Sequence, residues 1–134
     1  MWYELILEPD DNDTWFVTSP QFSEVATFGG TQEEACRNGR NAIEEAIASR
    51  IAGGGDIPLP LKETPGKGRF VEVPALVFLK SALYMILREQ GKTRADLMRA
   101  LDVKREHVDR LFRPDHNSRL ASLAEAFNVL GHPL

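Results

Sequence analysis

The sequence has little cysteine and no long hydrophobic run. Cys36 is the single cysteine among 134 residues, so an intrachain disulfide is excluded and a reducing compartment is expected. The chain does not begin with a basic segment followed by an apolar stretch, which argues against a signal peptide. The longest apolar run, 75–87, is interrupted by Lys80 and is shorter than the ~20 residues that span a bilayer. These absences predict a cytoplasmic protein with no membrane partner.

Motifs for cofactors, metals and nucleophilic catalysis are also missing. The triplet Gly53-Gly54-Gly55 follows a helical pattern and lacks the Gly-Lys-Ser/Thr ending of a phosphate loop. The histidines His107, His116 and His132 lie far along the chain from Cys36 and have no zinc-site spacing. We therefore expect no cofactor, no metal and no enzymatic activity.

The two halves of the chain differ in the sign of their charge. Residues 1–68 hold five Lys/Arg and twelve Asp/Glu, a net of −7, whereas residues 69–134 hold eleven and eight, a net of +3. The total of −4 therefore combines an acidic half with a basic half, which suggests two partners of opposite sign. The alternative is ordinary fluctuation of charge along a short chain.

The first half begins with a pattern typical of short strands. Apolar residues alternate over 3–8 with one extra apolar position, and apolar residues return at 15–17 and 25–28. Turn formers fill 9–13 between the first two segments. The pattern predicts a hairpin followed by a third short strand.

One amphipathic helix and a last strand complete the predicted first domain. Thr31 to Glu34 is a capping-box pattern, and apolar residues then recur every three or four positions until the glycine triplet. Prolines at 58 and 60 favour an extended segment, 64–68 is expected to be loop, and 69–73 a strand. The order β-β-β-α-β predicts an α+β domain over 1–68, whose last strand, 69–73, leads into the next domain.

The second half, 74–134, has helical periodicity throughout and is predicted to be an all-α domain. Its first helix, 75–90, is apolar on nearly every side and must therefore be buried on every side. A domain of about 60 residues buries only roughly 60% of its surface, so we predict a homodimer in which this helix meets its own copy; whether dimers join into tetramers stays open. The expected interface residues are Leu76, Phe78, Leu79, Leu83, Tyr84 and Leu87.

Three shorter helices are predicted over 93–101, 104–112 and 118–130. Only Asp102 and Val103 separate the first two, which suits a helix-turn-helix bend. Asp102 replaces the usual glycine, and aspartate tolerates the left-handed backbone better than most residues. The residues with core spacing are Leu97, Leu101, Val103, Val108 and Leu111.

With that core inward, the helix over 104–112 presents polar side chains outward. A helix fits the major groove, where arginine bonds both acceptors of guanine, while surrounding basic residues and a threonine suit phosphates. The alternative is a plain helical hairpin with a solvated charged face. The residues expected to contact DNA are Lys92, Thr93, Arg94, Lys104, Arg105, Glu106, His107, Arg110, Arg113 and Arg119.

Several short blocks occur in a fixed order between Tyr3 and Gly131. They are Tyr3-Glu4-Leu5, Trp15-Phe16-Val17, Gly29-Gly30-Thr31, Glu33-Glu34-Ala35, Ala42-Ile43, Ile57-Pro58-Leu59-Pro60, Phe70-Val71-Glu72-Val73-Pro74 and the helix-turn-helix through Arg110-Leu111-Phe112. The order and spacing of these blocks together resemble the HicB antitoxins of bacterial type II toxin–antitoxin pairs. The family often has aspartate where Gly30 stands, so the start of the helix is expected to differ slightly.

The resemblance implies a partner for each half. The family's N-terminal domain resembles a partial ribonuclease-H fold and binds HicA, a small basic RNA-cleaving toxin with a catalytic histidine. Its C-terminal domain binds double-stranded operator DNA of its own operon through a helix-turn-helix or a ribbon-helix-helix, and the helical pattern here selects the first. The residues expected to act on a HicA-like toxin are Glu4, Glu8, Asp10, Asp11, Asp13 and Trp15.

Two alternative functions fit parts of the sequence. One is a stand-alone transcription regulator whose α+β domain senses a small ligand. The other is a metal-dependent nuclease built on Glu4, Glu8 and Asp10, since true ribonuclease-H folds hold metal ions with carboxylates. Glu4 and Glu8, however, lie about 13 Å apart on a strand, too far to share one ion directly.

Overall fold

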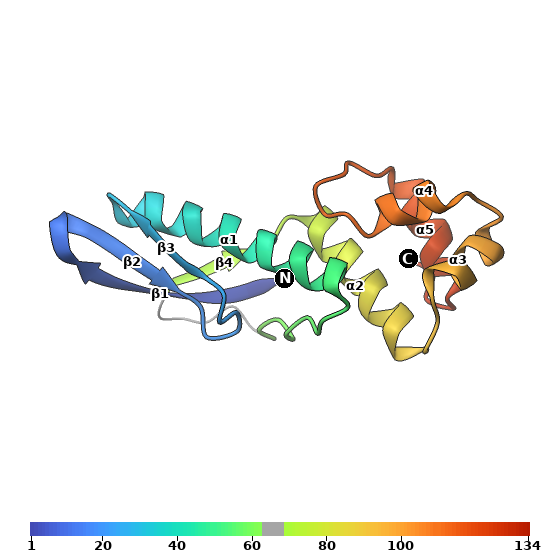
Figure 1. Cartoon of the computed structure of the whole chain (residues 1–134), viewed down its shortest axis with the longest axis horizontal. Helices are drawn as coiled ribbons and strands as arrows, with labels where there is room; N and C mark the ends of the chain where they lie inside the picture. Colours follow the sequence, from blue (N-terminus) through green and yellow to red (C-terminus); the bar gives the residue numbers. More distant parts are fainter. Residues whose placement is uncertain (63–68) are drawn as a thin grey trace. The chain divides into compact units, whose positions relative to one another are not determined.

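The structure of the protein is a computed structural model that describes residues 1–62 and 69–134. The chain divides into two compact units, Met1–Ser49 with Pro58–Pro74 and Arg50–Ile57 with Ala75–Leu134. Strands and one helix precede a series of helices (Figure 1), which confirms the α+β class. The loop predicted at 64–68 lies outside the described residues.

The first unit contains a four-stranded antiparallel sheet. Its strands are β1 (Trp2–Asp10), β2 (Thr14–Thr18), β3 (Ala26–Gly29) and β4 (Arg69–Glu72), in the order β3-β2-β1-β4. The predicted hairpin turns through a short 3-10 segment, Asp11–Asp13. The side chain of Asp10 accepts a hydrogen bond from the Asp11 amide at 2.8 Å, so the turn residues stabilise their own backbone as expected.

Helix α1 (Gln32–Gly53) lies between β3 and β4 in the chain and has defined signals at both ends. Thr31 Oγ1 accepts from the Glu34 amide at 3.1 Å, and Glu34 Oε2 accepts from the Gly30 amide at 3.3 Å. The reciprocal bond is therefore shifted by one residue from a standard capping box. At the other end Gly54 has a φ of 74°, and the Gly55 amide donates to the Arg50 carbonyl at 2.7 Å, which ends the helix at the predicted glycines.

Helix α1 covers one face of the sheet (Figure 1), and the core of the first unit lies between them. The buried strand residues include Tyr3, Leu5 and Val17, and the buried helix face includes Ile43 and Ile47. A Cβ at Gly39 would lie 2.7 Å from Leu5 Cδ1 and 3.0 Å from Val17 Cγ1, so glycine permits this close crossing. Among the described residues of this unit, no helix covers the opposite face, which we call the open face.

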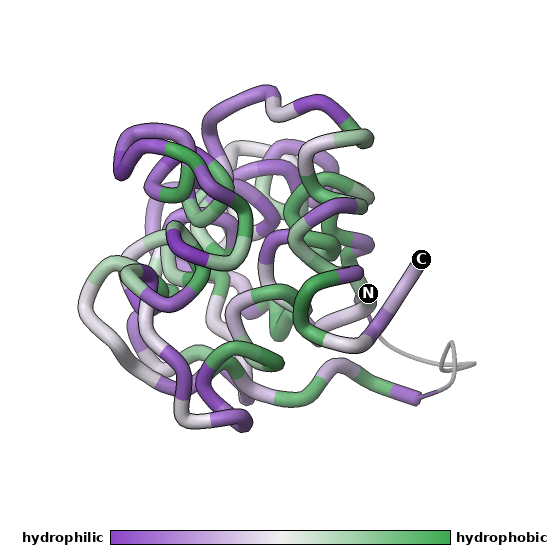
Figure 2. The backbone as a smooth tube through the Cα atoms, turned by 90° about the vertical axis from the view of Figure 1, so that its right-hand side faces the viewer, coloured by the Kyte–Doolittle hydropathy of each residue, from purple (hydrophilic) through white to green (hydrophobic). Residues whose placement is uncertain are grey.

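The second unit contains α2 (Ala75–Glu89), α3 (Arg94–Leu101), α4 (Arg105–Leu111) and α5 (Leu120–Val129). Helix α3 packs against α4 and α5, and α2 packs against α5. Along the chain the colour changes repeatedly between hydrophobic and hydrophilic residues (Figure 2), as expected where helices bury one face. No helix in the described part of the chain is both long enough and apolar enough to cross a membrane.

The core of the second unit is close to the one predicted. Leu97, Val108 and Leu111 are buried as expected, whereas Leu101 and Val103 are only half-buried. Helix α5 and the end of α4 complete this core, because they bring in further buried side chains that the spacing of α3 and α4 alone did not predict. These are Phe112, Leu123, Ala126, Phe127 and Leu130.

The end of α1 and the residues after it group with the second unit. The Tyr84 hydroxyl of α2 donates to the Gly55 carbonyl at 2.6 Å, and Arg88 pairs with Asp56 at 2.8 Å. These contacts associate 50–57 with α2, although the predicted first domain includes all of 1–68.

Candidate functional site

The bend between α3 and α4 positions the helix that was expected to contact DNA. Asp102 has a φ of 53°, the left-handed conformation that the sequence required of it. The Asp102 amide donates to the Arg99 carbonyl at 3.3 Å, and the Val103 amide to the Met98 carbonyl at 3.2 Å. These bonds satisfy carbonyls in the last turn of α3, and α4 begins after only three intervening residues.

The N-terminus of α3 is capped by Thr93. Its Oγ1 accepts from the Asp96 amide at 3.2 Å, and Asp96 Oδ2 accepts from the Thr93 amide at 2.8 Å. The backbone and side-chain hydrogen bonds from Thr93 lower the pKa of the Asp96 carboxyl. The threonine hydroxyl therefore serves this cap twice, as the acceptor for the Asp96 amide and in the side-chain hydrogen bond with the Asp96 carboxyl.

Arg94 connects α3 to α4. Its guanidinium bonds Asp109 at 2.9 Å and lies 5.0 Å from the centre of the Phe112 ring. Asp109 also lies 3.7 Å from Arg105 Nε, a looser contact. Arg94 is one of the residues expected to contact DNA, and in the free chain it pairs with Asp109 across the bend. Arg94 therefore has a structural role within the α3–α4 pair.

The outward face of α4 carries exposed charged side chains, as expected. Lys104, Arg105, Glu106 and Arg110 are all exposed. At the end of this helix a pocket of about 310 Å³ is lined in part by His107, Arg110, His116 and Arg119. The fold thus brings together three of the predicted DNA-contact residues, His107, Arg110 and Arg119, and adds His116, which the sequence did not indicate.

Lys80 of α2 binds the segment that follows α4. The side chain is 0% exposed, and its Nζ donates to the carbonyls of Arg110, Arg113 and His116 at 2.9, 2.7 and 2.6 Å. Burial lowers the pKa of Lys80 to about 8. At pH 7 the side chain is therefore still an ammonium group, whose three N–H donors match three acceptors. The sequence showed this lysine only as an interruption of the apolar run 75–87 and did not predict its hydrogen bonds.

The segment after α4 is further ordered by its own side chains. Arg113 and Asp115 pair at 3.0 Å, and this hydrogen bond raises the pKa of Arg113 and lowers the pKa of Asp115. Desolvation lowers the pKa of His116, and the positive charges of Lys80 and Arg110 lower it further. His116 is thus neutral at pH 7, with Nδ1 3.1 Å from the Ser118 hydroxyl oxygen, while Arg113 is already paired.

The residues expected at a dimer interface fall into two groups. Leu83, Tyr84 and Leu87 are buried within the single chain. Leu76 and Leu79 are half-buried, and Phe78 is 42% exposed. Part of the surface of α2 is buried by α5 and by residues 50–57 of the same chain, so a second copy is not needed to cover all of it. Leu76, Phe78 and Leu79 remain accessible to a second copy.

In the first unit, the register of the sheet separates the predicted toxin-contact residues. Glu4 and Glu8 alternate with the buried residues Tyr3 and Leu5 along β1, and so lie on the open face. Asp10, two residues after Glu8, extends this row of acids to the end of the strand.

The remaining predicted toxin-contact residues lie elsewhere. Asp11 and Asp13 are in the turn after β1. Trp15 is two residues from buried Val17 on β2, and therefore lies on the face toward α1 and not with the acids. Trp15, Phe16 and Val17 are consecutive apolar residues, so the sequence alone did not show which of them faces α1. In β1 the alternation was clear, with Ile6 as the extra apolar position.

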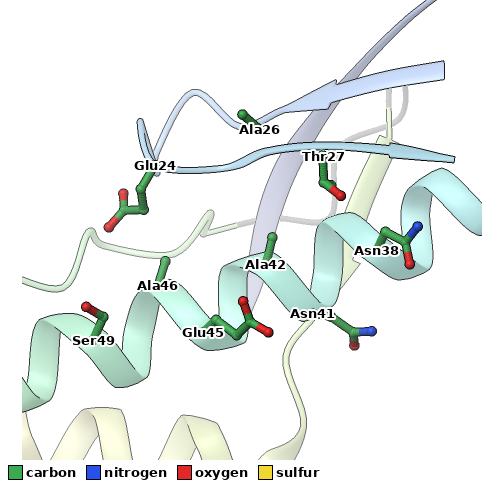
Figure 3. A pocket seen from close by; sticks show the side chains of 9 residues that line it. All are labelled: Glu24, Ala26, Thr27, Asn38, Asn41, Ala42, Glu45, Ala46 and Ser49. Atoms are coloured by element: carbon green, nitrogen blue, oxygen red, sulfur yellow. The ribbon is translucent and has the colours of Figure 1, made fainter.

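A groove of about 510 Å³ lies between the edge strand β3 and α1. Figure 3 shows Thr27 of β3 facing α1 residues that include Asn38, Ala42 and Glu45. Asn38 Nδ2 donates to the Phe28 carbonyl at 2.7 Å, which fixes the helix to this strand. The lining is mainly polar. The residues that the structure describes contain no group of three or more His, Cys, Asp or Glu placed to hold a metal ion.

Comparison with known proteins places the chain among bacterial antitoxins. Residues 2–82 match the profile of a family described as "HicB_like antitoxin of bacterial toxin-antitoxin system". Because this match covers more than half of the chain, the protein belongs to the HicB-like antitoxin family.

Similarity to individual antitoxins extends beyond the profile into the helical unit. The chain is 31% identical to Antitoxin HicB 2 of Photorhabdus laumondii over 134 residues, which is 100% of this chain and 94% of the relative. It is 29% identical to Antitoxin HicB of Pseudomonas fluorescens over 96% of this chain and 88% of the relative. It is 26% identical to Antitoxin HicB of Escherichia coli K12 over 100% and 96%.

Proposed function

We propose that the protein neutralises a HicA-like ribonuclease toxin through its first unit and represses its own operon through its second. The observation that carries this proposal is the similarity to HicB antitoxins across both units. It is supported by the charge division, because the acidic half suits a basic RNA-binding toxin and the basic half suits DNA.

The proposed inhibition is occlusion without chemistry. The first unit covers the RNA-binding surface and the catalytic histidine of the toxin, so that RNA has no access. Opposite charges on the two proteins raise the rate of encounter, and the salt dependence of toxin binding follows from the same field.

The proposed repression uses α3 and α4 as a helix-turn-helix. Helix α4 enters the major groove with Arg105 and Arg110 toward base edges. Lys92, Thr93 and Arg119 lie around it for phosphates. Two copies related by a two-fold axis contact half-sites about 34 Å apart, so the regulator acts as a homodimer.

Co-expression with the toxin tests the antitoxin role. The HicA-like toxin that the proposal expects from the neighbouring reading frame is induced in a bacterial host with and without the protein, and growth is followed. We expect growth to stop with the toxin alone and to recover when the antitoxin is present. Continued arrest, with the antitoxin shown to be folded and abundant, contradicts the proposal.

The alternative of a ligand-sensing regulator has weaker support. Small-molecule sites are mostly apolar pockets with a few placed polar groups. The groove beside β3 is instead lined mainly by polar side chains, among them Asn41, Glu45 and Ser49 (Figure 3). Nothing in its chemistry favours one ligand.

Phe78→Glu is expected to disrupt the proposed homodimer. Phe78 is the large apolar side chain of α2 that is 42% exposed, and a carboxylate placed against its symmetry copy costs desolvation and repulsion. We expect the dimer dissociation constant to rise at least ~30-fold, measured by analytical ultracentrifugation. Leu120→Glu, at an exposed leucine of α5, is the matched control. Unchanged dimerisation in Phe78→Glu contradicts an interface on α2.

A further inference from the structure

The open face of the sheet carries an aromatic and aliphatic cluster. Directly paired residues point to the same side of a sheet, and Glu8 pairs with Phe16, which in turn pairs with Phe28. Phe16 and Phe28 have ring centroids 5.1 Å apart. Phe28 is 49% exposed and Ile6, beside them on β1, is 40% exposed. The sheet therefore leaves apolar surface uncovered on the side away from α1.

The same face is acidic. Glu4 and Glu8 lie on it, and Asp10 extends the row at the end of β1. The four strands contain a single cation, Arg69, which pairs with Leu5 and so lies on the face toward α1. Its guanidinium hydrogen-bonds Gln32 of that helix. The strands thus contribute acids and no cation to the open face.

We propose that the open face is the surface on which the protein docks its basic toxin partner. Ile6, Phe16 and Phe28 form the apolar centre of the contact, and the carboxylates of Glu4, Glu8 and Asp10 form its rim. The inference rests on the proposed antitoxin function and assigns that function to one side of the sheet, away from the α1 side and the groove beside β3.

The charge of the face selects its occupant. A second copy would bring the same acids against themselves, and like charges brought together cost several kcal/mol in an interface. Nucleic acid would bring phosphates against carboxylates, which is unfavourable for the same reason. A basic protein instead pairs with the rim acids while its apolar atoms cover the phenylalanines. Aromatic residues at the centre and a polar rim are the usual arrangement of a protein interface.

The first test places the same cation on either side of one strand. Phe28 is on the open face, whereas its neighbour Thr27 pairs with the buried Val17 and lies at the groove toward α1. Phe28→Arg and Thr27→Arg therefore add equal charge one residue apart. We expect Phe28→Arg to weaken toxin binding at least ~30-fold and Thr27→Arg to change it less than about threefold. The fluorescence of Trp2 and Trp15 checks that the sheet is folded in both.

The second test addresses the acidic rim. Glu8→Lys reverses a charge on the open face, and Glu45→Lys reverses an exposed one on α1 beside the groove. We expect Glu8→Lys to slow association about tenfold at low salt, with the difference shrinking as salt rises, because rim charges act mainly on the association rate. Glu45→Lys is expected to have the smaller effect.

Binding is measured by calorimetry and stopped-flow, with the toxin used in the co-expression assay and carrying a substituted catalytic histidine. Failure of the wild-type protein to bind contradicts the antitoxin function itself. Wild-type binding combined with equal loss in Phe28→Arg and Thr27→Arg, or with no loss in Phe28→Arg, overturns the open-face assignment and leaves the function standing. If Phe28→Arg instead abolishes self-association, the occupant is a second copy and the assignment is also wrong.

Discussion

Lys80→Met is expected to lower the free energy of unfolding of the second unit by about 3 kcal/mol. The ammonium group donates to three carbonyls, those of Arg110, Arg113 and His116, and methionine fills similar space with no donor. Each of these carbonyls also accepts a backbone bond, from Arg113, His116 and Ser118 respectively. Because each carbonyl keeps its backbone bond, losing the lysine donor costs only ~1 kcal/mol of stability per carbonyl, the low end of the cost of an unsatisfied buried acceptor.

Two optical probes separate this effect from general unfolding. Both tryptophans, Trp2 and Trp15, are in the first unit, so their fluorescence follows the sheet. Helical circular dichroism also reports α2 to α5. In urea we expect Lys80→Met to move the dichroism transition to lower denaturant and to leave the fluorescence transition in place. Lys92→Met, at an exposed lysine, should stay within ~0.5 kcal/mol of wild type. Equal dichroism transitions for Lys80→Met and wild type contradict the role of Lys80.

The stability of the wild-type protein relative to Lys80→Met is also expected to depend on pH. Burial lowers the pKa of Lys80 from 10.5 to about 8, so between these values the unfolded chain holds a proton that the folded chain has released. The contribution of Lys80 to stability therefore rises with pH across that window and is constant below it, where both states are protonated. The stability difference between wild type and Lys80→Met should widen from pH 8 to 10.5 in urea titrations.

Local patterns predicted most of the elements. The alternation over 3–8, the turn formers after it and the glycines at 53–55 each act through neighbouring backbone, so they locate β1, its turn and the end of α1 without knowledge of the rest. Asp102 is a similar case, because the requirement for a left-handed residue at the bend is local. Such features are set by φ, ψ and side chains within a few positions.

Long-range contacts decided the features that the sequence did not predict. Lys80 looked like an interruption of an apolar helix, because its acceptors lie about thirty residues away in the segment after α4. The pairing of Arg94 with Asp109 was not predicted, because the fold brings that carboxylate of α4 to the start of α3. Trp15 was grouped with nearby acids, whereas the pairing of β2 turns it to the other face. Lys80 and Arg94 have partners on other helices or in other segments, and the side that Trp15 faces depends on the register between β2 and β1. Periodicity within one element carries no information about either.

Replacing Arg105 and Arg110 together by alanine is expected to abolish selective operator binding. Arg105 has a 79% exposed side chain and only a loose contact with Asp109, while the carbonyl of Arg110 is held by Lys80 at 2.9 Å. The side chain of Arg105 is thus free to turn toward the bases, and the backbone of Arg110 is fixed by Lys80. If both contact base edges, each loss costs ~1–3 kcal/mol and relaxes sequence preference.

Anisotropy titrations with operator and unrelated duplexes, each at two salt concentrations, separate reading of bases from attraction to phosphates. The double variant should lose at least ~30-fold in operator affinity and keep its weak binding to unrelated DNA. Lys92→Ala, at an exposed lysine before α3, should weaken both duplexes alike and reduce the salt slope by about one. Arg94→Ala should instead lower stability, since Arg94 joins α3 to α4 through Asp109. Operator affinity equal to wild type in the Arg105/Arg110 double variant would show that α4 does not read the DNA.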